Sequence, residues 1–341
     1  MKAVVLEKRG KDGIRIGNFA DPECPTGNAV IRVKAAALNH VDLYMRDSGK
    51  GITHELPMVL GLDAAGEIVE ADPLSGLKPG MAVMTYPMEF CGTCEYCQAG
   101  EQPFCSNLRI IGEQRHGTYG EYLSARAGCF LPIPDNLDWR QAAALPTAYM
   151  TAWRMVFGKS PLGAGETVLI HGIGGGVALA ALQFATMTGA RAIVTSGSDE
   201  KLAKAKALGA DQGINYSHGN VWPQVLEMTQ GRGVDMVIEN VGEATWDDSL
   251  RAARRGGRII VCGATTGGRP PADLQRIFVR QLQIFGSTAA NMAEYRALLG
   301  TVEQGLIKPV IDSVYGMDDA LDALDHMEGA KQFGKIVLDI G

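Results

Sequence analysis

The sequence lacks any uninterrupted apolar segment long enough to cross a lipid bilayer. Its longest apolar stretch, in residues 171–190, is interrupted by glycines and is too short to span a membrane. The opening residues, MKAVVLEKRGKDGIRIG, hold no apolar core of the kind that precedes a signal-peptide cleavage site. These absences predict a cytoplasmic protein with no membrane partner.

The sequence also lacks a basic tract. Its 32 Lys and Arg residues and 38 Asp and Glu residues give a net charge of -6, with both signs spread along the chain. Nucleic acid is therefore not an expected partner. With 46% hydrophobic and 21% charged residues, the composition is that of a globular protein, and 341 residues predict two domains.

Cysteine is scarce outside one short segment. Four of the seven cysteines, at positions 91, 94, 97 and 105, are spaced C-x2-C-x2-C-x7-C, whereas Cys24, Cys129 and Cys262 are isolated. Reduced thiols are the rule in the cytoplasm, so a disulfide is disfavoured. Four thiolates can form a closed tetrahedral zinc site. Free thiols and an iron–sulfur cluster remain as alternatives.

The distribution of apolar residues predicts two kinds of structure. Residues 1–125 contain short apolar or alternating runs separated by Gly, Pro and Asp, which indicates a mostly β domain. A helical pattern begins near residue 139, and strands and helices then alternate to about residue 288. Such alternation is typical of a doubly wound parallel sheet, so the predicted fold class is α/β.

A glycine-rich turn lies between a predicted strand and a predicted helix. It contains Gly172, Gly174, Gly175 and Gly176 in HGIGGGVALA. Glycine permits a tight turn and lets backbone amides approach a pyrophosphate at the helix N-terminus. Ala178 stands where a further glycine is often found, and it is small enough to serve. This context predicts a dinucleotide site rather than a merely tight turn.

The cofactor preference is predicted from the end of the next strand. Thr195 and Ser196 are neutral there, where an acidic residue would accept a hydrogen bond from the ribose 2′-hydroxyl of NAD. Lys201 follows on the first helical turn and can meet a phosphate, although Asp199 and Glu200 argue against this. We expect NADP(H) rather than NAD(H).

The chain resembles the medium-chain dehydrogenase/reductase superfamily along essentially its whole length. The matching motifs are LNHVDLYMRDSG (38–49), LPMVLGLDAAGEIVE (56–70), KPGMAV (78–83), the cysteine segment, GTYGEYL (117–123), AAALPTAYMTAW (142–153) and the glycine turn. The resemblance implies a GroES-like catalytic domain (1–147 and 289–341), with a zinc lobe at about 90–106, and a Rossmann domain (148–288). It also implies a structural zinc on Cys91, Cys94, Cys97 and Cys105, and a homodimer or homotetramer.

The resemblance also marks where a catalytic zinc would bind, and those positions lack zinc ligands. They hold Asn39, Leu62 and Thr147; Leu62 cannot coordinate a metal, and the other two offer weak neutral oxygens. His40, Asp42 and Asp63 could assemble a different metal site. We favour the interpretation that the two aspartates are turn or supporting residues and that His40 is an ordinary pocket histidine.

A site without that zinc is better suited to an activated acceptor than to an alcohol. The segment LNHVDLYMR is similar to the quinone oxidoreductase branch, which implies reduction of a quinone or an α,β-unsaturated carbonyl. The candidate catalytic residues are Tyr44, as a hydrogen-bond or proton donor, with Asn39 and Asp42. The rivals are an alcohol or aldehyde dehydrogenase with an unusual metal site, and a non-catalytic NADPH-binding protein.

The predicted cofactor contacts extend beyond the glycine turn along the Rossmann domain. From the resemblance and from the ends of the predicted strands, they are Thr151, Gly172, Gly174, Gly175, Gly176, Val177, Ser196, Lys201, Tyr216, Asn240, Gly263, Ser287 and Lys335. Loops near 50–56 and 264–272 are expected to border the substrate pocket.

Overall fold

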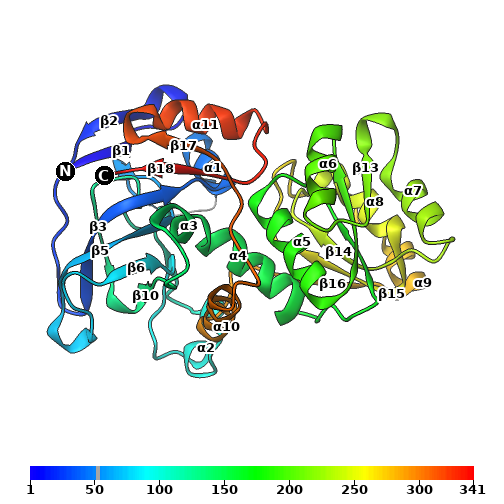
Figure 1. Cartoon of the computed structure of the whole chain (residues 1–341), viewed down its shortest axis with the longest axis horizontal. Coiled ribbons are helices and arrows are strands. Elements are labelled where there is room, and N and C mark those ends of the chain that lie inside the picture. Colours follow the sequence, from blue (N-terminus) through cyan, green and yellow to red (C-terminus); the bar gives the residue numbers. More distant parts are fainter. Residues whose placement is uncertain (51–53) are drawn as a thin grey trace. The chain divides into compact units, whose positions relative to one another are not determined.

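The computed structural model describes residues 1–50 and 54–341, which form two compact units (Figure 1). Unit 1 comprises residues 1–148 and 291–341, and unit 2 comprises residues 149–290. The domain boundaries expected from the sequence were 147/148 and 288/289. Part of the loop expected near 50–56, residues 51–53, lies outside the described residues. In the described chain, no helix combines the length and apolarity that crossing a membrane requires.

Unit 1 is built on a seven-stranded sheet with two smaller sheets beside it. The large sheet has the order β10 (Phe130–Pro132), β6 (Ala82–Thr85), β5 (Asp63–Ala71), β3 (Asn28–Ala37), β18 (Lys335–Asp339) and β17 (Ile311–Gly316), with β9 (Tyr122–Arg126) paired to β3. A three-stranded sheet contains β2 (Ile14–Asn18), β1 (Lys2–Leu6) and β4 (Met58–Val59), and a two-stranded sheet contains β7 (Met88–Glu89) and β8 (Arg109–Ile110).

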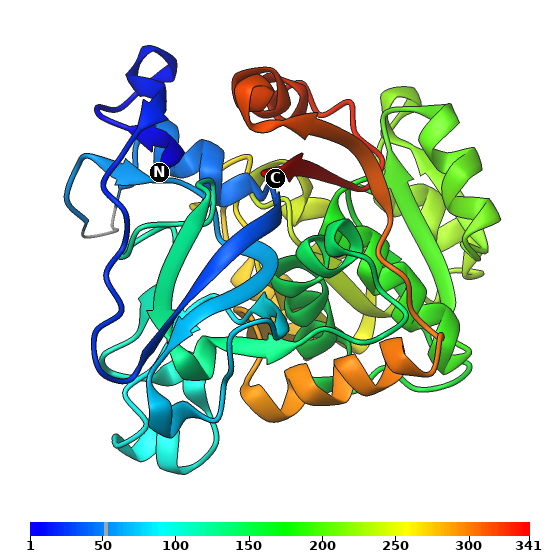
Figure 2. The ribbon, with the colours of Figure 1, turned by 60° about the vertical axis from the view of Figure 1, so that its left-hand side comes forward.

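The first and last parts of the chain meet in this sheet. Strand β18 runs antiparallel to β3, with Val337 opposite Ala37 and Asp339 opposite Ala35. Figure 2 shows the dark red final strand beside blue β3. This pairing places the start of β18 next to the end of β3, where helix α1 (His40–Asp47) begins.

Helices and apolar side chains fill the remaining space in unit 1. The helices are α1, α2 (Glu95–Gln98), α3 (Trp139–Ala144), α4 (Pro146–Trp153, which crosses the unit boundary), α10 (Met292–Glu303) and α11 (Ala320–Glu328). The core includes Ile31, Leu60, Ile68 and Leu338, all fully buried. Burial of such side chains is the main stabilising contribution to the unit.

Unit 2 is a parallel six-stranded sheet with helical connections. Its order is β13 (Gln212–Asn215), β12 (Arg191–Ser196), β11 (Thr167–Ile170), β14 (Val234–Glu239), β15 (Ala253–Val261) and β16 (Gln283–Gly286). Its helices are α5 (Gly176–Thr188), α6 (Asp199–Ala207), α7 (Val221–Met228), α8 (Glu243–Ala252) and α9 (Leu274–Arg280). The order reverses direction on the two sides of β11, as in dinucleotide-binding sheets.

The predicted fold class is confirmed: a GroES-like, mostly β unit accompanies a Rossmann unit. The predicted alternation of strands and helices is present between residues 167 and 288, and it includes two helices, α8 and α9, for which no helical segment was predicted. Ser198 caps α6 by accepting a hydrogen bond from the Lys201 amide, and Gly209 follows the helix end in a left-handed conformation.

Candidate active site

A buried polar network in unit 1 joins three segments that are far apart in the sequence. The Lys335 ammonium group, at the start of β18, donates to the Leu38 carbonyl at 2.6 Å and to Asn39 Oδ1 at 2.6 Å. It also lies 3.4 Å from Asp63 Oδ2, at the start of β5. The Lys335 side chain is 4% exposed and that of Asp63 is fully buried. The network therefore contains a cation and an anion that solvent does not screen.

Asp63 connects Lys335 to two more polar groups. Its Oδ2 accepts a hydrogen bond from Asn39 Nδ2 at 2.9 Å. Its Oδ1 accepts from the Thr147 amide at 3.1 Å and from the Thr147 hydroxyl at 2.5 Å. The carboxylate thus has several donors, which compensates for its burial.

Asp42 forms the adjoining part of the network on α1. Its Oδ2 accepts from the Asn39 amide at 2.7 Å and from the Tyr119 hydroxyl at 2.6 Å. Its Oδ1 is buried and has no hydrogen-bond partner among the described residues. Burial raises the pKa of Asp42 to about 7, against the opposing effects of the Tyr119 and Asn39 hydrogen bonds.

The donor set of this network does not suit a catalytic zinc. Leu62 offers no ligand atom, and Asn39 and Thr147 hydrogen-bond to Lys335 and Asp63. In residues 1–50 and 54–341, four cysteines form the single group of three or more His, Cys, Asp or Glu side chains close enough to share a metal. His40, Asp42 and Asp63 form no such group in this part of the chain.

Tyr44 lies apart from the buried network. The residue is 42% exposed, and its hydroxyl donates to the Lys50 carbonyl. The structure therefore brings Asn39 and Asp42 together with Asp63 and Lys335 but does not bring Tyr44 into contact with them. The catalytic role of these residues stays a prediction.

The four clustered cysteines of unit 1 converge. Their sulfur atoms lie within 4.8 Å of one another, and Cys91 Sγ is 3.9 Å from Cys97 Sγ. Ligands about 2.3 Å from a tetrahedral zinc lie about 3.8 Å apart, so the set fits that metal. The Cys94 amide donates to Cys91 Sγ at 3.3 Å and the Cys91 amide to Cys105 Sγ at 3.3 Å, which suits thiolate acceptors. A closed site of this kind holds a loop in place and leaves no position for a substrate.

In unit 2, the glycine turn lies where a dinucleotide phosphate would bind. It follows β11, and α5 begins at Gly176 with Gly175 as its N-cap. Gly172 and Gly174 have φ values of 67° and 120°, which residues with a side chain rarely adopt. Val177 follows in the first turn of α5, and Thr151 is buried on α4. The exposed amides of a helix start favour an anion.

Three predicted residues lie at the ends of strands in the same sheet. Asn240, Gly263 and Ser287 follow β14, β15 and β16. A Cβ atom on Gly263 would lie 2.5 Å from the Asn240 carbonyl oxygen, so only glycine fits there. Asn240 Oδ1 and Ser287 Oγ are buried without a hydrogen-bond partner among the described residues. Unsatisfied buried groups at this edge fit a polar ligand such as a nicotinamide nucleotide.

The residues expected to select the cofactor gather at the end of β12. Ser196 Oγ accepts from the Ser198 amide at 3.1 Å. The Tyr216 ring packs on Gly197, where an added Cβ would lie 2.9 Å from the ring. The two acidic residues nearby are engaged by other groups: Asp199 accepts from Asn215 at 2.7 Å, and Glu200 pairs with Lys204 at 2.7 Å.

A second buried network, which was not predicted from the sequence, lies at the end of β14. Glu239, fully buried at the end of β14, accepts from the Gly242 amide at 2.9 Å and from Ser249 Oγ at 2.5 Å. Ser249 in turn contacts His171 Nε2 at 3.1 Å. The sequence signal for this network was Glu239, the acidic residue in the motif VIENVG. Its hydrogen bond from the Gly242 amide fixes the turn after β14.

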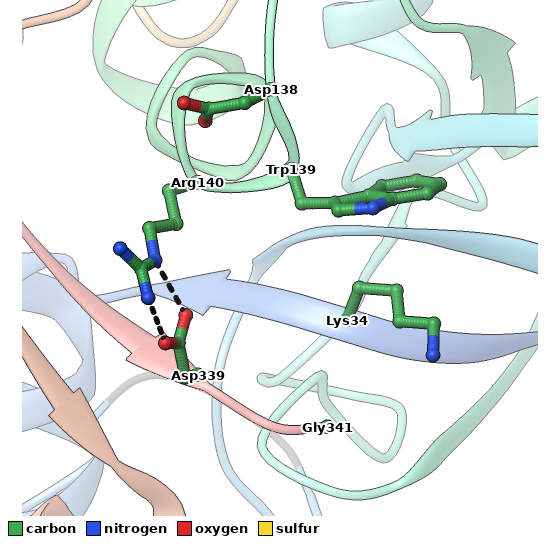
Figure 3. A pocket seen from close by; sticks show the side chains of 6 residues that line it. All are labelled: Lys34, Asp138, Trp139, Arg140, Asp339 and Gly341. Atoms are coloured by element: carbon green, nitrogen blue, oxygen red, sulfur yellow. Dashed lines mark hydrogen bonds and ion pairs between the residues drawn. The ribbon is translucent and has the colours of Figure 1, made fainter.

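A pocket of about 510 Å³ on unit 1 shares no lining residue with the network around Lys335. Figure 3 shows the residues that line it: Lys34, Asp138, Trp139, Arg140, Asp339 and Gly341. The Arg140 guanidinium pairs with the Asp339 carboxylate, with one bond of 2.9 Å. This ion pair links α3 to β18, so we assign Arg140 and Asp339 a structural role.

Two family descriptions match the chain: "Alcohol dehydrogenase GroES-like domain" over residues 25–135 and "Zinc-binding dehydrogenase" over residues 176–304. A protein named NAD-dependent alcohol dehydrogenase from Sulfolobus acidocaldarius is 32% identical, with 100% of both chains covered. A protein named acryloyl-coenzyme A reductase from Metallosphaera sedula is 28% identical, with 99% of both covered. A crystal structure titled as an NAD-dependent alcohol dehydrogenase superposes with a TM-score of 0.95 at 39% identity, covering 100% of both chains.

The fold and these relatives define an oxidoreductase. The chain belongs to the medium-chain dehydrogenase/reductase superfamily, among its zinc alcohol dehydrogenase-like members. A nicotinamide cofactor and zinc are expected for this family, and the four-cysteine site is present.

Proposed function

We propose that the protein is an NADPH-dependent reductase of quinones or α,β-unsaturated carbonyl compounds that uses no metal at its reacting centre. One observation carries this proposal. Asn39, Leu62 and Thr147 replace the expected metal ligands, and Asn39 and Thr147 belong instead to a hydrogen-bonded network around Asp63 and Lys335. Oxidation of an alcohol needs its alkoxide to be stabilised, whereas a conjugated acceptor is already electrophilic.

The proposed chemistry assigns a role to each candidate residue. The nicotinamide cofactor, when bound, supplies a hydride, which forms a C–H bond at the acceptor as the conjugated double bond shifts towards oxygen. Tyr44 releases the Lys50 carbonyl and donates its proton to the resulting oxyanion. Asn39 orients the substrate, and Asp42 holds the Asn39 amide and the Tyr119 hydroxyl. Solvent then reprotonates Tyr44.

The surroundings of β12 support NADPH as the reductant. Ser196 at the end of β12 is uncharged. The Asp199 carboxylate accepts a hydrogen bond from the Asn215 side chain. Glu200 is paired with Lys204 on the same helix. Lys201, in the first turn of α6, is the residue that we assign to the 2′-phosphate, and the Tyr216 ring packs on Gly197 at the end of β12.

The relative named acryloyl-coenzyme A reductase supports the substrate class, because an acryloyl group is an α,β-unsaturated acyl group. A second candidate function is oxidation of an alcohol with NAD, which the names of other relatives favour. That function requires a Lewis acid or base at the alcohol oxygen. The two functions therefore differ in substrate, in cofactor and in the number of metal ions needed.

A paired assay tests the proposed function. Purified protein would be supplied with NADPH and a panel of quinones and enones, including an enoyl thioester, and in parallel with NAD and a panel of alcohols. We expect NADPH oxidation with at least one conjugated acceptor and no NAD reduction with alcohols. NAD-dependent alcohol oxidation without enone or quinone reduction would contradict the proposal. Binding of NADPH without turnover of any acceptor would favour a non-catalytic role.

We also propose that the chain forms a homodimer or homotetramer. In unit 2, β16 is an edge strand on which Ile284 is 40% exposed, and Leu274 and Phe278 on α9 are 68% and 67% exposed. Exposed apolar groups beside an unpaired strand edge favour association with a second copy. Light scattering on the purified protein would measure the number of chains, and a monomer would contradict this proposal.

A further inference from the structure

The network around Asn39 contains a cation at the place where the resemblance expects a metal. The ligand positions are 39, 62 and 147. Lys335 Nζ contacts Asn39 directly at 2.6 Å and reaches Thr147 through Asp63, which lies 3.4 Å from the ammonium group. Asp63 directly follows Leu62 in the chain. The ammonium group therefore contacts one substituted position, Asn39, directly and is linked to a second, Thr147, through Asp63.

The surroundings of Lys335 provide an oxygen atom for each proton of its ammonium group. An ammonium group has three protons, and three oxygen atoms face it: the Leu38 carbonyl, Asn39 Oδ1 and Asp63 Oδ2. Each acceptor is itself fixed by secondary structure, at the end of β3 or the start of β5. The side chain is 4% exposed. A charge buried this deeply persists only where partners of this kind compensate for its desolvation.

The same contacts determine how Asn39 is oriented. Because the ammonium group can only donate, the atom of the Asn39 amide that faces it must be the oxygen. The amide nitrogen is then directed at Asp63 Oδ2, at 2.9 Å. Removing the cation would leave the Asp63 carboxylate buried without its positive partner and would free the Asn39 amide to rotate.

We propose that the Lys335 ammonium group takes the place of the catalytic metal, as the buried cation that positions Asn39 and Asp63 in a metal-free reductase site. Lys335 is then a positioning residue of unit 1. This assignment differs from the cofactor contact that the resemblance implies for Lys335. It rests on the proposed function only in that the site works without a metal.

Lys335→Met tests the proposal, because methionine fills the space without the charge. Two quantities separate the two roles: the Kd for NADPH, from quenching of protein fluorescence, and kcat at saturating NADPH. We expect the variant to bind NADPH within twofold of the unaltered protein and to lose at least tenfold in kcat. A tenfold rise in the Kd with unchanged kcat would overturn the proposal in favour of a cofactor contact. Lys34→Met is the control, since Lys34 lines the separate pocket of Figure 3, and it should change neither quantity.

A second variant covers the case in which Lys335→Met does not fold. The pair Asp63→Asn with Lys335→Met removes both buried charges, so the proposal predicts that it melts at a higher temperature than Lys335→Met alone and still binds NADPH. Equal or lower stability of the double variant would contradict the claim that the ammonium group offsets the Asp63 charge. The NADPH and melting measurements need no substrate, so they judge this inference even if no quinone or enone is reduced.

Discussion

At the scale of single residues, the candidate site shows how replacing a few side chains changes the chemistry that a shared fold can support. Asn39, Leu62 and Thr147 cannot together hold a zinc ion, and the polar groups that remain are arranged around Lys335 and Asp63 instead. In the proposed mechanism, this hydrogen-bonded network takes the place of a Lewis acid.

Asp42 gives the first prediction, on the pH dependence of stability. Its pKa is raised from 3.8 to about 7 by burial, so the native state holds a proton that the unfolded chain releases in this range. The stabilising contribution of protonated Asp42 is complete below pH 3.8 and is lost as the pH rises towards 7. Relative to Asp42→Asn, which does not titrate, the unaltered protein should lose about 4 kcal/mol of unfolding free energy over that interval.

Urea unfolding at several pH values between 4 and 8 measures this difference. Asparagine keeps an oxygen for the Tyr119 hydroxyl and the Asn39 amide, so the variant should remain folded. If the unaltered protein keeps the same stability relative to Asp42→Asn at every pH, or gains stability relative to it as the pH rises, then Asp42 does not hold a proton in the native state.

Lys201 gives a second residue-scale prediction, on cofactor preference. If it meets the 2′-phosphate, Lys201→Ala should raise the Kd for NADPH about tenfold and leave that for NADH within twofold, because only NADPH carries that phosphate. Lys204→Ala, one turn further along α6 and paired with Glu200, is the matched control. Titration of both cofactors by calorimetry gives the values. An equal loss for the two cofactors would remove Lys201 from the proposed phosphate contact.

At the scale of secondary-structure elements, an ion cluster joins the beginnings of three strands in the Rossmann unit. Asp235 on β14 is buried and accepts from Arg232 at 2.6 Å, from Arg254 on β15 at 2.6 Å and from the Thr167 amide on β11 at 2.9 Å. These partners hold the pKa of the Asp235 carboxyl well below its usual range, even though burial alone would raise it. The carboxylate therefore contributes stability above its ordinary pKa and loses it as the pH falls.

This cluster gives the element-scale prediction. Asp235→Asn should lower the free energy of unfolding at pH 7 by about 3 kcal/mol, because both arginines lose their buried anion. Asp247→Asn breaks an ion pair on α8 with a 69% exposed aspartate and should cost less than about 1 kcal/mol. Denaturant unfolding of the two variants compares them directly. Equal costs would show that the Asp235 cluster does not join the strands as described.

At the scale of the whole molecule, the sequence predicted the strands of the Rossmann unit and its helices α5, α6 and α7, because their cues are local, but it did not predict α8 and α9. Apolar runs, the Ser198 cap and the glycines at turns each act within a few residues. The convergence of the four cysteines was predictable for the same reason, since all lie within one short segment.

The buried network was not predictable from local patterns. Lys335 and Asn39 are 296 positions apart, and they meet only because β18 pairs with β3. Tyr119 and Asp42 are 77 positions apart. Residue type alone marks neither contact: a lysine at the start of a strand is usually solvated, and burial here depends on the complete sheet. The motifs located Asn39 and Asp42, but they did not predict that the Lys335 ammonium group contacts Asn39.

The central claim is that the protein transfers hydride at a site without a metal, while its single zinc stabilises a loop. The measurement that tests it most directly is the zinc content per chain of protein purified without chelator and active with NADPH, together with Cys94→Ser and the control Cys24→Ser. We predict one zinc in the unaltered protein and in Cys24→Ser, and none in Cys94→Ser. Two zinc ions per chain, one of them retained in Cys94→Ser, would contradict the account and indicate a metal-dependent dehydrogenase.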